Sequence, residues 1–210
     1  MRSNVPAKDF RQMSVAKARI IAHLIGDGAL YQTRHDYVIK YEVKDLSLIK
    51  QFSSDLIEVY GLEPHFHLNS SGKTGKPLIF ARLRSKIVYE DLLQCATYRS
   101  YTWCIGKAIM DASLPIKRGF LRALFDDEGT VVKEGKRGII RFYSVNHSGT
   151  LQVQHLLKEV GLPSILRPGY GAARNVYGVN IPALEDFASV IGFSLERKQK
   201  KLMDFLGERE

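Results

Sequence analysis

Two stretches of the chain, one in each half, share a pattern of apolar and polar positions and end in the same way. Residues 55–64 read DLIEVYGLEP, and residues 154–163 read QHLLKEVGLP. In each stretch, apolar residues recur at helical spacing until a glycine, a leucine and a nearby proline stop the pattern. We therefore predict two amphipathic helices, with Gly61 and Gly161 as left-handed caps.

The surroundings of these two helices repeat as well. Two strand-like stretches precede each helix, at 30–31 and 37–43 in the first copy and at 130–132 and 139–145 in the second, with β-formers and polar residues interleaved. Two more strand-like stretches separated by a turn follow each helix, and a short helical stretch closes each copy: 65–68, 78–83 and 89–93, then 165–167, 175–181 and 184–188. Such a repeat predicts an α+β fold made of two pseudo-symmetric halves, each αββαββα once an opening helix is added.

A break in the helical pattern at residues 113–115, which read SLP, marks the boundary between the copies. We assign residues 1–112 to the N-terminal half and residues 113–210 to the C-terminal half. The basic run at 196–201 predicts a solvated helix face.

The net charge of the chain says more about its possible partners than its composition does. With 45% hydrophobic and 25% charged residues, the composition is that of an ordinary globular protein. The net charge of +9, from 31 basic and 22 acidic residues, suits a polyanionic partner, either nucleic acid or an acidic membrane surface. A basic surface that is merely solvated is the simpler alternative.

The expected location is intracellular, in the cytoplasm. No apolar run approaches the roughly 20 residues of a membrane helix, and the first residues lack the apolar stretch of a secretory signal. Cys95 and Cys104 are the two cysteines of the chain. Without a C-x-x-C pair they favour neither a zinc site nor a disulfide framework, and we expect buried thiols.

Each half opens with an apolar helix that ends in an acid followed by glycine. Residues 18–30 read ARIIAHLIGDGAL, and residues 118–130 read RGFLRALFDDEGT. This pair of motifs resembles the LAGLIDADG homing endonuclease family, in its single-chain form with two motifs. The resemblance implies that Asp27 and Glu128 are the catalytic acids. The simpler alternative is a pair of plain helix ends with glycine caps.

Small residues on the two opening helices favour close packing of one helix against the other. Ala22 and Gly26 lie four residues apart on one face, and Ala123 matches them in the second helix. If the helices lie side by side, their C-terminal ends meet, and Asp27 faces Glu128. Two carboxylates at two negative helix ends suit a divalent cation, Mg²⁺ or Mn²⁺, as the resemblance also implies.

The metal-ligating candidates are the two acids and the residue before each: Asp27, Glu128, Gly26 and Asp127. Asp127 departs from the family pattern, which has a small residue there. Its carboxylate could loosen the helix interface, add a metal ligand or point into solvent. The resemblance also implies a polar residue that assists catalysis, for which Lys44 and Asn146, next to the relevant strands, are the candidates.

The resemblance implies a curved antiparallel sheet in each half that binds DNA, since the major groove admits a two-stranded β-ribbon. An ordinary polar sheet face is the alternative for any single residue. The DNA-binding candidates are Gln32, Arg34, Lys40, Glu42, His67, Lys73, Lys76, Arg82, Arg84, Lys133, Lys136, Arg137, Arg141, Tyr143, Arg167, Arg174, Asn175, Tyr177 and Asn180.

The function that the resemblance implies is intron homing by a monomeric, metal-dependent endonuclease. Such an enzyme hydrolyses both strands of double-stranded DNA at a long, pseudo-palindromic site and leaves short 3′ overhangs. Two alternatives use the same surface: an RNA maturase that binds intron RNA, and a DNA-binding protein that does not cleave. Protein splicing, known for inteins with a similar nuclease core, is not expected, because the chain starts Met-Arg-Ser and ends Gly-Glu-Arg-Glu.

Overall fold

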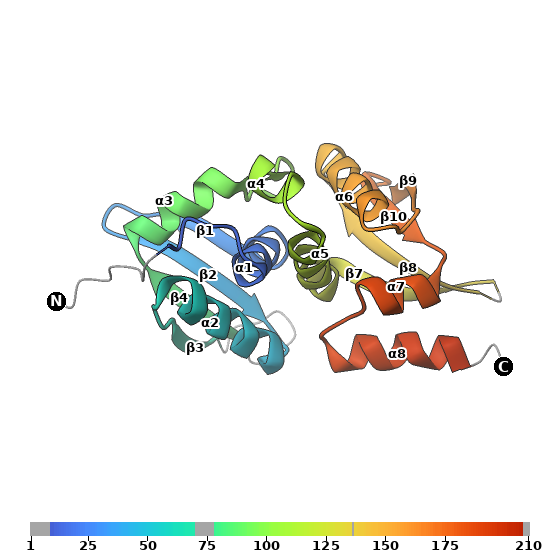
Figure 1. Ribbon diagram of the computed structural model, residues 1–210, viewed down its shortest axis with the longest axis horizontal. Coiled ribbons are helices and arrows are strands. Elements are labelled where there is room, and N and C mark those ends of the chain that lie inside the picture. Colours follow the sequence, from blue (N-terminus) through green and yellow to red (C-terminus); the bar gives the residue numbers. More distant parts are fainter. Residues whose placement is uncertain (1–8, 70–77, 136, 208–210) are drawn as a thin grey trace.

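The computed structural model of the chain describes residues 9–69, 78–135 and 137–207, and it has the predicted α+β fold with two similar halves (Figure 1). The first half consists of α1 (Val15–Ile25), β1 (Gly28–Gln32), β2 (Tyr37–Val43), α2 (Leu46–Tyr60), β3 (His65–Asn69), β4 (Leu78–Arg84) and α3 (Lys86–Cys95). The second half consists of α5 (Leu114–Glu128), β7 (Gly129–Glu134), β8 (Arg137–Ser144), α6 (His147–Glu159), β9 (Ile165–Tyr170), β10 (Val176–Ile181) and α7 (Leu184–Val190).

Additional elements connect the two halves and follow the second one. The connection contains β5 (Ala96–Thr97), β6 (Cys104–Ile105) and α4 (Lys107–Met110), and α8 (Glu196–Gly207) follows α7. The segment at 113–115 starts a helix: Ser113 is the N-cap of α5, and Pro115 lies in its first turn, where proline's missing N–H costs nothing.

Each half contains one antiparallel four-stranded sheet, and the two sheets have the same strand order, β1-β2-β4-β3 and β7-β8-β10-β9. Their registers match too. Lys40 on β2 and Arg141 on β8 each lie opposite the second residue of the first strand and therefore occupy equivalent positions. Gly61 and Gly161 have positive φ angles, as predicted for left-handed caps.

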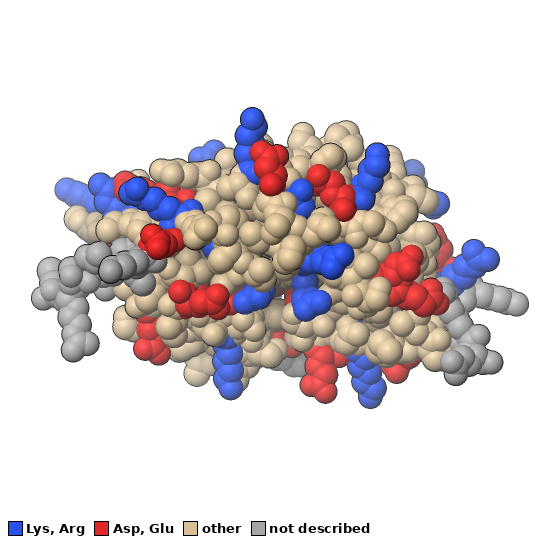
Figure 2. Space-filling model, viewed as in Figure 1, with Lys and Arg blue, Asp and Glu red and all other residues tan. Residues whose placement is uncertain are grey.

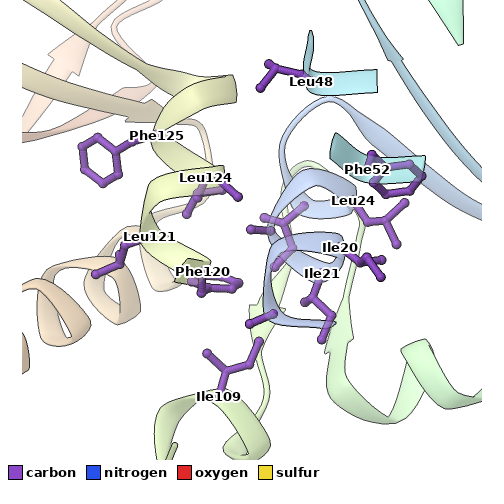
Figure 3. Close-up of a cluster of buried hydrophobic side chains, with 14 of the residues drawn as sticks. Ile20, Ile21, Leu24, Leu48, Phe52, Ile109, Phe120, Leu121, Leu124 and Phe125 are labelled. Atoms are coloured by element: carbon purple, nitrogen blue, oxygen red, sulfur yellow. The ribbon is translucent and has the colours of Figure 1, made fainter. Parts of the chain in front are cut away.

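Helices α1 and α5 lie side by side at the centre of the molecule, with one sheet on either side (Figure 1). All residues of α1 from Ala16 to Ile25 except Arg19 are buried, because α5 covers one side of the helix and α2 and the first sheet cover the other. Figure 3 shows the apolar cluster that α1, α2, α4 and α5 build around this contact. Each fully buried Leu or Ile contributes about 1.5–3 kcal/mol.

The central helices run parallel and touch at both ends. Near their start, a Cβ added to Gly119 would come within 2.7 Å of the Val15 side chain. At their end, a Cβ added to Gly26 would meet Asp127 Oδ2 at 2.7 Å. Glycine is needed at both points because no side chain fits between the helices. The C-terminal ends of α1 and α5 therefore meet, as expected from their small residues.

The segment between the halves packs on the second half. The Trp103 ring fills the space beside Gly149 on α6, and its Nε1 donates a hydrogen bond to Ser144 Oγ at 3.2 Å. Cys95 is buried, as predicted, but Cys104 is exposed and corrects our expectation. On the two-residue strand β6, alternation turns Ile105 inward and Cys104 outward. In the described part of the chain, no helix combines the length and apolarity needed to cross a bilayer.

Candidate active site and nucleic-acid interface

The two predicted acids lie at matching points of the two halves, where a central helix turns into a strand. Asp27 separates α1 from β1, and Glu128 ends α5 directly before β7. A Cβ added to Gly28 would come within 2.6 Å of Leu24 Cα, and one added to Gly129 within 2.6 Å of the Phe125 carbonyl oxygen. Each strand therefore folds back so tightly on its own helix that only glycine fits after the acid.

These glycines are not left-handed helix caps. Gly129 has φ −84° and ψ 153°, which is extended backbone, and Gly28 is absent from the residues with positive φ among those described. The alternative of plain glycine caps therefore does not account for the motif. The close approach of strand and helix does, and it fixes the backbone of both acids.

The acids are close enough for the charge of one to affect the other. Burial raises the pKa of Glu128 to about 7, and the negative charges of Asp27 and Asp127 contribute to the rise. The Asp27 side chain is partly open to solvent. The protein around it still removes enough water to raise its pKa to about 6, and the negative charge of Asp127 adds to this rise. Such carboxylates repel each other and favour a bound proton or cation.

The donor set fits a hydrated divalent cation. No group of three or more His, Cys, Asp or Glu residues within the described ranges is arranged to hold a metal ion. Two carboxylates are nevertheless enough for Mg²⁺, which keeps several water ligands and commonly takes others from a substrate phosphate. A cavity of about 280 Å³ adjoins Glu128 and is also lined by Gly26, Trp103 and Phe142.

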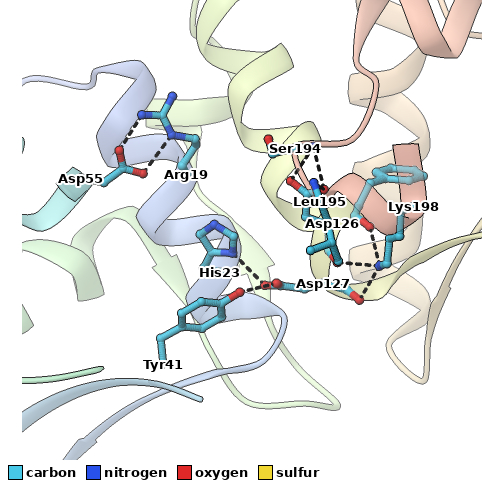
Figure 4. A network of polar contacts seen from close by, with 10 residues as sticks. Arg19, His23, Tyr41, Asp55, Asp126, Asp127, Ser194, Leu195 and Lys198 are labelled. Carbon is cyan, nitrogen blue, oxygen red and sulfur yellow. Dashed lines mark hydrogen bonds and ion pairs between the residues drawn. The ribbon is translucent and has the colours of Figure 1, made fainter. Parts of the chain in front are cut away.

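The Asp127 carboxylate does not point into solvent, which was one of the three roles that the sequence left open. It is fully buried and points from α5 into the first half, where its Oδ2 lies 3.0 Å from His23 Nδ1 and its Oδ1 accepts a 2.5 Å hydrogen bond from the Tyr41 hydroxyl (Figure 4). The carboxylate thus joins the two halves. Each carboxylate oxygen has one protein partner and retains a further lone pair, so the place of Asp127 among the metal candidates stays a prediction.

The negative charge of Asp127 raises the pKa of the two side chains that it binds. Burial acts to lower the pKa of His23, but the charge and hydrogen bond of Asp127 outweigh it, so the pKa lies above its ordinary value. Burial, together with Asp127, raises the pKa of Tyr41 well above its ordinary value. Below the raised pKa of His23, the contact is therefore an ion pair between His23 and Asp127, supported by a hydrogen bond from the tyrosine hydroxyl.

Lys198 is a residue of the site that the sequence did not reveal. We expected a solvated face at 196–201, yet Lys198 is buried. Its charge lowers the pKa of both Asp27 and Glu128. A local signal was present: Lys198 has the helical spacing of Leu195 and Leu202, which are both buried, and so lies on the inward face of α8.

The candidates for catalytic assistance differ in their surroundings. Lys44 is exposed between β2 and α2. Asn146 is buried as the N-cap of α6: its Oδ1 accepts a hydrogen bond from Gly149 N at 3.1 Å, and its Nδ2 donates one to the Trp103 carbonyl oxygen at 2.6 Å. The Asn146 amide therefore holds α6 and the connecting segment in place.

In the first sheet, the side chains that point away from the helices form a polar face. Lys40 Nζ lies 2.5 Å from Glu42 Oε2 and 4.5 Å from the centre of the Phe80 ring. His67 stacks on the same ring and lies 3.1 Å from Arg82 Nη2. Desolvation and the charge of Arg82 lower the pKa of His67, so a neutral imidazole can accept the Arg82 hydrogen bond.

In the second sheet, Arg141 is the centre of a polar network. Its Nε donates to Asn180 Oδ1 at 2.5 Å, its Nη1 donates to the Tyr143 hydroxyl at 3.3 Å, and its guanidinium lies 4.7 Å from the centre of the Tyr170 ring. Arg141 and Asn180 are consequently buried. They hold the tyrosines in place instead of standing free at the surface.

The other DNA-binding candidates divide by exposure. Tyr177 is half-buried on β10. The exposed candidates are Gln32, Arg34, Arg84, Lys133, Arg137, Arg167, Arg174 and Asn175. Lys73, Lys76 and Lys136 lie outside the described residues.

Charge does not gather on the face of the molecule shown in Figure 2, where basic and acidic side chains are interspersed. The net charge of +9 therefore produces no single basic patch on that face. The outward sheet residues described above remain the candidate nucleic-acid interface.

Comparisons with known proteins agree with this geometry. Residues 115–192 match the family model of a LAGLIDADG-like domain. The chain is similar to the replicative DNA helicase DnaB of Nostoc sp. (strain PCC 7120), with 25% identity over 214 residues that cover 95% of this chain and 24% of the helicase. The chain therefore spans about a quarter of the length of this curated relative.

Similar solved structures include two homing endonucleases. A structure of I-DmoI in complex with DNA and Ca has a TM-score of 0.66 and 20% identity, over 92% of this chain and 99% of that one. I-WcaI bound to its DNA recognition sequence has a TM-score of 0.61 and 14% identity, over 93% of this chain and 91% of that one. These likenesses show the fold.

Proposed function

We propose that this chain, whose residues 115–192 match the model of a LAGLIDADG-like domain and whose fold is that of homing endonucleases, is a site-specific DNA endonuclease that cuts both strands. One observation carries the proposal: Asp27 and Glu128, each followed by a sterically required glycine, lie at the adjacent ends of two parallel helices between two sheets. Two acids in matching positions suit the two strands of a duplex, which are themselves related by a twofold axis.

The cofactor is a divalent cation, Mg²⁺ or Mn²⁺, held by Asp27 and Glu128. Structures of I-DmoI with DNA and Mn and with DNA and Ca support a cation of this kind. A bound cation lowers the pKa of a water molecule and stabilises the oxygen that leaves the phosphodiester. The protein contributes the rigid helix ends that hold both carboxylates, with the main chain of Gly26 beside the first of them.

The DNA partner lies across the outward faces of the two sheets. Residues 1–112 contact one half-site and residues 113–210 the other, so a monomer reads a long, pseudo-palindromic target. Exposed arginines and lysines at the sheet ends contact phosphates, and Lys40, at the centre of the first sheet, lies toward the bases, while Arg141 positions the tyrosines of the second sheet for the DNA. Cleavage leaves short 3′ overhangs, and the biological role is intron homing.

A cleavage assay tests this function. A plasmid library with randomised inserts is incubated with the protein in Mg²⁺, in Mn²⁺ and in EDTA, and linear products are sequenced. Asp27→Asn and Glu128→Gln, which keep the shape of each side chain, run in parallel. We expect cutting at one sequence that is lost in EDTA and falls at least about 100-fold in either variant, while DNA binding persists.

The alternatives predict different results. Sequence-specific DNA binding without cutting under every metal condition would show a DNA-binding protein on this fold. Tight binding to a folded intron RNA, with neither DNA cleavage nor specific DNA binding, would show a maturase. Either result rejects the endonuclease proposal.

A further inference from the structure

The last turn of α5 is capped by a lysine from another helix. Lys198 Nζ, on α8, donates hydrogen bonds to the carbonyl oxygens of Phe125 at 3.1 Å, Asp126 at 2.5 Å and Asp127 at 3.1 Å (Figure 4). The last carbonyls of a helix carry partial negative charge, and of these three the Phe125 oxygen also accepts the Gly129 N–H, so a buried ammonium suits all of them. The last of the three capped carbonyls belongs to Asp127, the residue directly before Glu128.

The same turn of α5 caps the beginning of α8 in return. The Asp126 carboxylate accepts hydrogen bonds from the backbone N–H of Ser194, at 2.9 and 3.2 Å, and of Leu195, at 3.1 Å. A carboxylate at the start of a helix has the favourable sign, as the ammonium has at the end. Asp126 is 2% exposed and Lys198 is 8% exposed, so solvent weakens neither contact much.

The first half has no counterpart to this pair of caps in the described residues. Aligned on the glycine after each acid, Ile25 occupies the position of Asp126. Ile25 is a buried apolar residue and can accept no such hydrogen bond. Of the two acids, Glu128 alone therefore follows a helix end that α8 anchors.

We propose that Lys198 and Asp126 are positioning residues that fix Glu128 against its own scissile phosphate, so that α8 controls cleavage of one DNA strand. The inference rests on the proposed endonuclease function. Because the halves and the duplex strands are both related by twofold axes, each acid lies nearer to one strand. A shift of about 1 Å in a reacting group costs about 100-fold in rate, so releasing α5 from α8 slows that strand more than the other.

The test follows each strand separately. Supercoiled plasmid with the target site and linear target labelled on either strand are cut by the wild type, Lys198→Met and Lys198→Arg. We expect Lys198→Met to accumulate nicked circles and to cut one strand about 10- to 100-fold more slowly than the other. Lys198→Arg keeps the charge and the donors, and we expect it to restore most of the lost rate. Lys200→Met, an exposed lysine on the same helix, is the matched control.

A second measurement needs neither metal nor DNA. In metal-free protein, hydrogen exchange at the amides of Ser194 and Leu195 should quicken in Lys198→Met, while α1 amides keep their protection. If Lys198→Met does not fold, Asp126→Asn, which keeps the shape and one acceptor, takes its place in both experiments.

The outcomes separate the two proposals. A wild type that cuts no DNA with any metal rejects the endonuclease and this inference together. A wild type that cuts both strands, with Lys198→Met either normal or slowed equally on both strands, rejects the positioning role alone. Unequal strand rates rescued by Lys198→Arg support it, because a general loss of stability would not distinguish the strands.

Discussion

The Tyr41 hydroxyl on β2 donates a 2.5 Å hydrogen bond to the Asp127 carboxylate on α5, and this contact joins the first half of the chain to the second. The carboxylate also binds His23 and is fully buried. Its position next to Glu128 means that this polar contact between the halves and the candidate catalytic centre share one turn of helix. Substitutions at this contact should therefore first of all change the free energy of unfolding.

We predict that Tyr41→Phe lowers the free energy of unfolding by about 1–3 kcal/mol, because one oxygen of a buried carboxylate loses its donor. Urea unfolding of the metal-free protein measures the loss. In an Asp127→Asn background the same substitution should cost less, since the acceptor is no longer charged. Equal costs in the two backgrounds would show that the two side chains are not coupled.

The ion pair between His23 and Asp127 predicts a pH dependence of stability. The pKa of His23 is raised in the folded protein above its ordinary value of 6.5. The stabilisation is therefore fully present below about pH 6.5 and is lost as the pH rises through the folded-state pKa. The wild type should exceed His23→Gln in unfolding free energy by more at pH 6 than at pH 9. An NMR titration that places the His23 pKa below 6.5 would contradict this prediction.

The candidate catalytic acids, when ionised, should lower the stability of the metal-free protein. The folded-state pKa of Glu128 rises from 4.5 to about 7, so the folded protein binds its proton more tightly than the unfolded chain does. Ionisation at pH 8 therefore disfavours the fold. We predict that Glu128→Gln unfolds at higher temperature than the wild type at pH 8, with a gain on the order of 1–3 kcal/mol.

This gain should shrink as the pH falls from 8 through 7 and disappear near pH 4, where the wild-type carboxyl is protonated in both states. Glu63→Gln, at an exposed position, is the control and should change little at any pH. A Glu128→Gln variant that is less stable than the wild type at pH 8 would mean that Glu128 has a stabilising partner.

Much of the fold could be predicted because its signals are local or repeated. The helices that end at Gly61 and Gly161 are marked by their own periodicity and caps, and the repeat of those marks predicted two similar halves. The acid and glycine at the end of each central helix are adjacent in sequence. The steric requirement for glycine after each acid is local too, since each strand folds back on the helix that precedes it.

The rest depends on contacts that no local pattern encodes. Asp127 binds His23 and Tyr41 across separations of 104 and 86 residues, and Lys198 reaches the carbonyl of Asp127 across 71. Asn146 is a different case. An asparagine directly before a helix is a capping signal that the sequence carries locally, and the structure shows Asn146 as the buried N-cap of α6, while its catalytic role stays a prediction.

The last prediction concerns the phosphate contacts of the second sheet. Arg167 on β9 is exposed, and its position opposite Gly178 puts it on the outward face, since the next pair, Leu166 and Val179, turns toward the core. We expect Arg167→Ala to weaken binding similarly for all DNA sequences. The slope of log binding constant against log salt concentration should fall by about 1, the value for one lost phosphate contact.

Lys158→Ala is the matched control, because Lys158 is also exposed but lies on α6, which covers the opposite face of the same sheet. Its slope should equal that of the wild type. Fluorescence anisotropy with target and unrelated duplexes at several salt concentrations provides both slopes. If both variants lower the slope alike, the basic residues act through net charge alone, and the outward face of the sheet is not where the DNA lies.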